Sequence, residues 1–146
     1  MDLNAVLTTA EAIAREAGAL LMDGFGRDKE IHTKSSAVDF VTQFDVAAEH
    51  LITTRLRAAF LDHGLVGEEG TNEGDAAGLT WHIDPLDGTS NFSHGFPVFC
   101  VSLALYDGSR PLVGVIYDPT RDECFSVAPE NCGLPKGAWP WRADMS

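Results

Sequence analysis

The sequence has little positive charge: its 146 residues contain 10 Lys+Arg against 22 Asp+Glu, a formal net charge of −12 at pH 7. A protein that binds nucleic acid by itself needs clustered Lys and Arg to displace the counterions of the phosphates. The composition therefore argues against a nucleic-acid partner, and anionic membrane surfaces are disfavoured for the same reason. If the protein handles a phosphate, most of the positive charge must come from something other than its own side chains.

Long apolar runs and cysteines are also scarce. No segment approaches the roughly 20 apolar residues that span a bilayer, and Asp2 and Glu11 near the amino terminus do not fit a signal peptide. Cys100, Cys124 and Cys132 are an odd number and lack paired metal-type spacing, which favours reduced thiols. We therefore expect a cytoplasmic protein with no membrane partner. Hydrophobic residues make up 45% of the chain, which is ordinary for a globular domain.

The first third of the chain carries helical periodicity. Apolar residues recur at three- and four-residue steps from Val6 to Leu21, which predicts a helix over about the first 25 residues, with a capping box formed by Thr8 and Glu11. The polar segment 29–36 is predicted to be a mobile hairpin or flap. Residues 38–41 are predicted to be a short extended run.

A second helix is predicted to begin near Thr42 or Asp45 and to run to Phe60, with Val46 on its buried side and Gly64 as its stop. After Gly64 the hydrophobic period changes from helical to alternating. Short strands are then predicted at residues 65–67, 79–83, 98–106, 112–117 and 124–127.

This order of elements predicts an α+β fold, in which two amino-terminal helices pack on a mostly antiparallel sheet. We assign residues 1–127 to this domain and residues 128–146 to an atypical tail rich in Pro, Gly and Trp. A sheet that stopped there would leave an unpaired edge strand. The natural fold is therefore expected to continue beyond this end.

The strongest local signal is the segment 84–92, Asp-Pro-Leu-Asp-Gly-Thr-Ser-Asn-Phe, which follows an expected strand. Asp84 and Asp87 lie three residues apart on a turn, so their carboxylates can converge, and Pro85 restricts the backbone between them. Gly88 permits a sharp bend and close approach of a ligand. If a helix begins after it, the first amides of that helix would donate to an anion.

A second acidic pair, Glu68 and Glu69, follows another expected strand. Carboxylates on turns are the ligands that Mg²⁺ prefers, and together with amides that hold a phosphate they suggest metal-assisted phosphoryl hydrolysis. Taken separately, each feature is more often an ordinary turn or a solvated loop. An EF-hand calcium loop does not fit, because Leu86 and Gly88 would occupy its third and fifth positions.

Together these residues resemble the inositol monophosphatase family of metal-dependent phosphomonoesterases. Residues 84–92 are similar to the family signature, and residues 67–69 to its Gly-Glu-Glu element. Residues 34–45 resemble the family's flap and the segment after it, and residues 114–117 a later strand. The resemblance covers most of the chain, to about residue 127.

The resemblance implies a magnesium site. Two ions would divide the work: one would activate a water, and the other would stabilise the leaving alkoxide. The implied metal ligands are Glu68, Asp84, Asp87 and the backbone carbonyl of Leu86, with Glu69 further out.

The resemblance also implies how substrate and water are held. Glu68 and the Thr89 hydroxyl would orient the water, Asp45 would support Thr89, and Lys34 would approach the water from the flap. The substrate would be a small phosphate monoester, held by Asp87, Gly88, Thr89 and Ser90.

Other residues are interpreted as structural. Asp39 is expected in a turn or cap, and His82 and His94 as packed or surface side chains. Core positions around the site are expected to be Trp81, Phe92, Phe96 and Phe99.

The chain departs from the family in length. Family members are nearly twice as long, and their carboxy-terminal half supplies another Asp to the metals and most contacts to the substrate alcohol. The chain therefore resembles an amino-terminal half. An inositol monophosphate is the first substrate hypothesis, with a sugar bisphosphate, histidinol phosphate or a 3′-phosphonucleotide as alternatives. The rival hypothesis is a truncated, inactive fragment that binds metal weakly or serves assembly, and its exposed sheet edge would favour association, for example as a homodimer.

Overall fold

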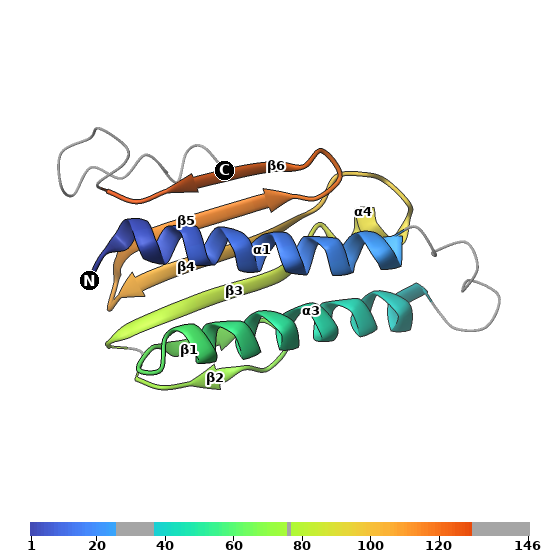
Figure 1. Ribbon diagram of the computed structural model, residues 1–146. Coiled ribbons are helices and arrows are strands. Elements are labelled where there is room, and N and C mark those ends of the chain that lie inside the picture. Colours follow the sequence, from blue (N-terminus) through green and yellow to red (C-terminus); the bar gives the residue numbers. More distant parts are fainter. Residues whose placement is uncertain (26–36, 76, 130–146) are drawn as a thin grey trace.

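The computed structural model describes residues 1–25, 37–75 and 77–129 (Figure 1). Its long helices are α1 (Leu3–Phe25) and α3 (Ala37–Ala59), and a short helix α4 (Thr89–Ser93) lies between two strands. The strands are β1 (Gly64–Gly67), β2 (Asn72–Glu73), β3 (Leu79–Asp87), β4 (Cys100–Asp107), β5 (Arg110–Asp118) and β6 (Glu123–Val127).

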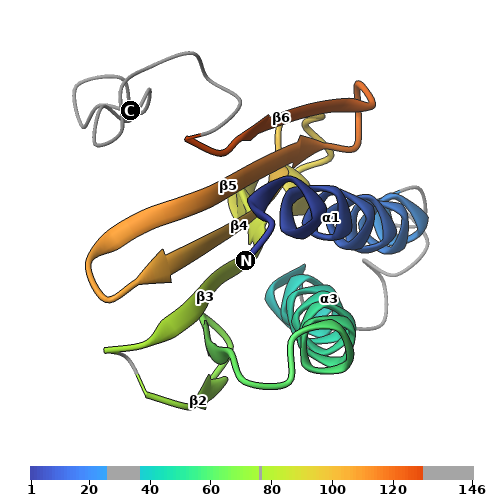
Figure 2. The same ribbon diagram turned by 60° about the vertical axis from the view of Figure 1, so that its left-hand side comes forward.

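The strands form one six-stranded sheet in the order β2-β1-β3-β4-β5-β6. β1 and β3 run parallel, and every other neighbouring pair is antiparallel. α1 and α3 lie side by side across one face of this sheet, α1 over β4 and β5 and α3 over β3 (Figures 1 and 2). The α+β prediction of two helices on a mostly antiparallel sheet is confirmed. The proposed boundary at residue 127 stays a prediction.

The first helix covers the residues that its periodicity predicts, but its start differs. The Asp2 carboxylate accepts hydrogen bonds from the backbone N–H groups of Asn4 and Ala5, at 3.0 and 3.3 Å, so Asp2 is the capping residue. Thr8 lies inside the helix, where its hydroxyl donates to the Asn4 carbonyl. The predicted capping box of Thr8 and Glu11 is therefore wrong.

The second helix begins earlier than predicted. Residues 38–41 belong to α3 and are not extended, and Asp39 lies in the first turn of this helix. The β-branched residues favour a strand locally, but Val41 continues the buried column of α3, so packing overrides propensity. Val46 is wrong as a core residue, because it is 49% exposed on the opposite side of the helix. Gly64 starts β1 and does not end the helix.

The core lies between the two helices and the sheet. α1 contributes a column of small and medium residues, and its Gly18 leaves room for the Tyr117 ring, which a Cβ would approach to 2.4 Å. The prediction of Phe96 as a core residue is wrong, because this side chain lies in the loop between α4 and β4 and is 58% exposed. Buried sheet residues that face the helices include Trp81, Ile83, Val101, Leu103, Leu105, Val113 and Val115.

Candidate functional site

The acidic residues of two neighbouring strands meet because those strands are parallel. β1 and β3 pair in the register Gly67↔Ile83, and Glu68 and Asp84 are the residues that come next on each strand. The carboxyl ends of parallel strands lie at the same edge of a sheet, where ligands commonly bind. The charge of Glu68 is among the causes that raise the pKa of Asp84, so the two carboxylates lie close enough to repel each other. The sequence predicted the two acidic segments but not the parallel pair that joins them.

The folded structure disfavours the ionised form of the Asp84 carboxyl group. Burial, followed by the charges of Glu68 and Asp87, raises its pKa to about 6, although the hydrogen bond from the Leu86 N–H acts in the opposite direction. β3 is irregular between Asp84 and Asp87, which brings the second carboxylate of the motif near the first. Asp84 Oδ1 is buried and has no hydrogen-bond partner within the described residues. A buried, unpartnered carboxylate oxygen calls for a cation or a proton.

Asp45 on α3 joins the same cluster. It is 7% exposed, and burial, followed by the charges of Glu69, Asp84, Glu68 and Glu49, raises its pKa to about 7. The side chains of three separate elements therefore contribute to one acidic site. The support that Asp45 is expected to give the Thr89 hydroxyl stays a prediction.

The segment after β3 turns sharply into α4. Gly88 precedes the helix with φ 98°, which L side chains rarely adopt. A Cβ at Gly88 would lie 2.9 Å from the Val98 carbonyl oxygen, so the close packing also requires glycine. Thr89 and Ser90 open the helix with exposed side chains, and their contact with a phosphate stays a prediction. Lys34 lies outside the described residues.

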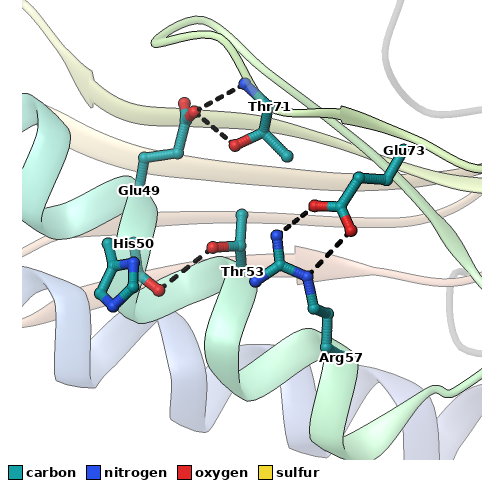
Figure 3. Close-up of polar contacts among 6 residues, drawn as sticks. All are labelled: Glu49, His50, Thr53, Arg57, Thr71 and Glu73. Carbon is teal, nitrogen blue, oxygen red and sulfur yellow. Dashed lines mark hydrogen bonds and ion pairs between the residues drawn. The ribbon is translucent and has the colours of Figure 1, made fainter.

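A buried acid that the sequence analysis missed supports the loop after β1. Glu49 on α3 is 3% exposed, and its carboxylate accepts a hydrogen bond from the Glu69 N–H. It also accepts hydrogen bonds from the Thr71 N–H and the Thr71 hydroxyl (Figure 3). Its spacing of four residues from Asp45 was the available signal, because residues at i and i+4 share a helix face.

The space beside the acidic cluster is open and partly apolar. A groove of about 600 Å³ runs from Glu68 and Asp84 along the face of the sheet that α1 and α3 do not cover. Its walls include His82, Ser102 and Tyr106. On the other side, Cys100 Sγ lies 3.9 Å from an Asp87 oxygen, and burial, with the nearby Asp87 and Asp84 charges, raises the pKa of this thiol to about 12. Cys100 is therefore a neutral thiol beside the cluster.

The donor set fits a hard divalent cation, although it is not closed. All gathered groups are oxygen donors, the type that Mg²⁺ prefers, and the orphaned Asp84 Oδ1 lies among them. No set of three or more His, Cys, Asp or Glu side chains in residues 1–25, 37–75 and 77–129 is arranged as a complete metal site. The chain thus offers part of a ligand shell, with strong negative charge that a cation would neutralise.

The raised pKa of Asp45 predicts how stability depends on pH. Its folded pKa of about 7 lies above the ordinary value of 3.8, so the folded chain retains a proton that the unfolded chain releases. The stabilisation is full below pH 4 and is lost as pH rises to about 7, by about 4 kcal/mol for the metal-free chain. Urea unfolding at pH 5 and pH 8 measures it, and in Asp45→Asn this part of the pH dependence should disappear. An unchanged slope in the variant would show that Asp45 titrates normally.

The fold and the acidic strand ends define an α+β protein with a cation-seeking site, and the sequence profile of the inositol monophosphatase family matches residues 2–138. The chain belongs to the inositol monophosphatase family. It is similar to inositol monophosphatase 2 of Solanum lycopersicum, with 44% identity over 121 residues, covering 78% of this chain and 44% of that protein. It is also similar to the Nus factor SuhB of Xylella fastidiosa, with 40% identity, covering 79% of this chain and 42% of that protein.

Solved structures show the same fold. The inositol monophosphatase from Anabaena (Nostoc) superposes with a TM-score of 0.76 at 36% identity, covering 91% of this chain and 47% of that one. The extragenic suppressor protein SuhB from Bartonella henselae gives a TM-score of 0.74 at 35% identity, covering 85% and 48%. The chain spans about half the length of the curated relatives that it matches.

Two predictions concern membranes and nucleic acid. None of the described helices is long and apolar enough to cross a membrane. The prediction of no nucleic-acid partner stays a prediction, because relatives include proteins named Nus factor SuhB.

Proposed function

We propose that this chain provides the metal-binding and phosphate-binding half of a Mg²⁺-dependent phosphomonoesterase that acts on a small phosphate monoester, first of all an inositol monophosphate. The observation that carries the proposal is the meeting of Glu68 and Asp84 at the ends of parallel strands, with Asp84 Oδ1 buried and unpartnered. Similarity to proteins named inositol monophosphatase supports the substrate. A sugar bisphosphate, histidinol phosphate or a 3′-phosphonucleotide remain alternative substrates.

Each residue has a defined task in this proposal. Mg²⁺ would be held by Glu68, Asp84, Asp87 and the Leu86 carbonyl, and when bound it supplies positive charge and acidifies water. The Glu68 side chain is exposed in the loop after β1. Its carboxylate accepts a hydrogen bond from the attacking water and orients it together with the Thr89 hydroxyl. The backbone N–H groups of Gly88 and Thr89 donate to the phosphate oxygens, with Ser90 beside them. Asp45 and Lys34 assist, Asp45 by holding the Thr89 hydroxyl and Lys34 by approaching the water.

A second candidate function is that of a fragment that binds metal weakly and does not turn substrate over. The incomplete ligand set in the described residues and the half-length match to relatives favour it. In that case the open groove and sheet edge would serve association, for example as a homodimer. For either function we propose a cytoplasmic location and no membrane partner.

Phosphate release from an inositol monophosphate in the presence of Mg²⁺ tests the proposal. Asp87→Asn is expected to lower the rate at least about 100-fold, because it removes a charged ligand. Asp107→Asn is the matched control. This exposed acid is the last residue of β4, whereas Asp87 of β3 pairs with Cys100, the first residue of β4. Equal rates in wild type and Asp87→Asn would contradict the proposal. Mg²⁺ binding by calorimetry without phosphate release in either chain would favour the second candidate.

A further inference from the structure

We propose that Glu49 is a positioning residue: by holding the loop from Gly67 to Thr71, it places Glu68 within the acidic cluster. This inference rests on the proposed function, because it concerns a ligand of that site. It assigns a role to a buried carboxylate that does not itself touch substrate.

Within the described residues, the side-chain hydrogen bonds of Glu49 go to this loop. Oε1 accepts from the Glu69 N–H at 2.9 Å, and Oε2 accepts from the Thr71 hydroxyl at 2.7 Å and from the Thr71 N–H at 3.3 Å. Figure 3 shows the Glu49 side chain extending from α3 to Thr71. Hydrogen bonds to an ionised acceptor are roughly twice as strong as neutral ones. The loop is therefore fixed at Glu69, the residue directly after Glu68, and again at Thr71.

Gly67 makes room for this arrangement. A Cβ at residue 67 would lie 2.4 Å from the Glu49 carboxylate carbon and from Oε1. The Gly67 N–H in turn donates to the Thr71 carbonyl at 2.9 Å, which closes the loop on itself. The carboxylate thus sits where a side chain at residue 67 would be, and the loop wraps around it.

The same helix places a second member of the cluster. Asp45 and Glu49 are four residues apart on α3, about 6 Å along the helix axis, and the charge of Glu49 is among those that raise the pKa of Asp45. Ala48 and Ile52, both 0% exposed, hold α3 against the sheet. One rigid element therefore sets both the position of Asp45 and the conformation of the loop that carries Glu68.

A nearby contact provides a matched control. Arg57, two turns further along α3, forms an ion pair with Glu73 of β2, with Arg57 Nε 3.0 Å from a Glu73 oxygen (Figure 3). Both side chains are nearly half exposed. This pair joins α3 to β2, which follows the loop that ends at Thr71. Its loss should therefore loosen β2 and leave Glu68 in place.

The test compares Glu49→Gln with Arg57→Gln by two measurements. Mn²⁺ binding followed by EPR is expected to weaken about 10-fold in Glu49→Gln, the usual effect of removing a residue that orients a metal ligand, and to change less than about 2-fold in Arg57→Gln. Amide hydrogen exchange at Glu69 is expected to accelerate in Glu49→Gln only. A Gln side chain has a single acceptor oxygen and cannot accept from both Glu69 and Thr71. Thr71→Val should repeat the effect in part, and Thr71→Ser should restore it.

Gly67→Ala gives an independent measurement. Its Cβ collides with the Glu49 carboxylate, so it should weaken Mn²⁺ binding in the wild type but add nothing in a Glu49→Ala background. Equal Mn²⁺ affinity in wild type and Glu49→Gln, or equal losses in Glu49→Gln and Arg57→Gln, would overturn the positioning role alone. A wild-type chain that binds no Mn²⁺ would overturn the proposed function as well.

Discussion

Replacing Asp84 with Asn is expected to abolish most divalent-metal binding and, at the same time, to make the metal-free chain more stable. Asp84 is the acid whose buried oxygen has no partner in the described residues and whose neighbours are Glu68 and Asp87. The amide removes one of the repelling charges, and at pH 8 this should raise the free energy of unfolding by about 2 kcal/mol. Loss of a charged ligand should weaken Mg²⁺ binding at least about 100-fold.

Thermal unfolding with and without Mg²⁺ measures both effects. The wild-type Tm should rise on adding Mg²⁺ and the Asp84→Asn Tm should not, while the metal-free variant should unfold at a higher temperature than the metal-free wild type. Asp107→Asn, on the far end of the same sheet, should behave as wild type. A variant that is less stable without metal would show that Asp84 makes a structural contact and does not suffer repulsion.

The second large effect is expected at Gly88. Gly88→Ala should destabilise the chain by about 2–4 kcal/mol, because it combines a φ of +98° with a Cβ 2.9 Å from the Val98 carbonyl and 3.2 Å from the Phe99 Cα. Neither atom can move without shifting the chain that enters β4. The same change should tilt the start of α4 and disturb the expected phosphate contacts of Thr89.

Urea unfolding of Gly88→Ala and Gly95→Ala separates conformation from collision. Gly95 also has a positive φ, +72°, but nothing lies within 4 Å of an added Cβ. Its substitution should cost only about 1–2 kcal/mol. Equal losses at both glycines would mean that the contact with residues 98 and 99 is not tight.

Much of the fold can be predicted from the local periodicity of apolar residues. The buried side of α1 follows from the recurrence of its apolar residues, and the strands follow from alternation. The early start of α3 could not be predicted, because the β-branched residues at 38–41 favour a strand until a sheet is present to pack against. The predictions that Val46 and Phe96 are buried were wrong for a related reason. An apolar side chain does not by itself show which side of its element faces the core.

The residues of the site also fall into those that the sequence predicted and those that only the fold shows. A dense motif at residues 84–92 and its family resemblance pointed to Asp84, Asp87 and Gly88. Glu49 escaped notice because a glutamate in a helix is usually solvated, and only the fold shows that a loop with Gly67 wraps around it. Parallel pairing of β1 and β3 was equally invisible, since it depends on which strands become neighbours.

The pairing of β1 with β3 has a consequence for how this centre tolerates change. Successive residues of a strand point to opposite faces, so slipping β1 by one position would turn Glu68 away from Asp84 and present a neighbour instead. An insertion or deletion inside β1 would therefore misalign the centre even where every acidic residue was retained. A change of length between β2 and β3 leaves the pairing of β1 with β3, and therefore this alignment, unaltered.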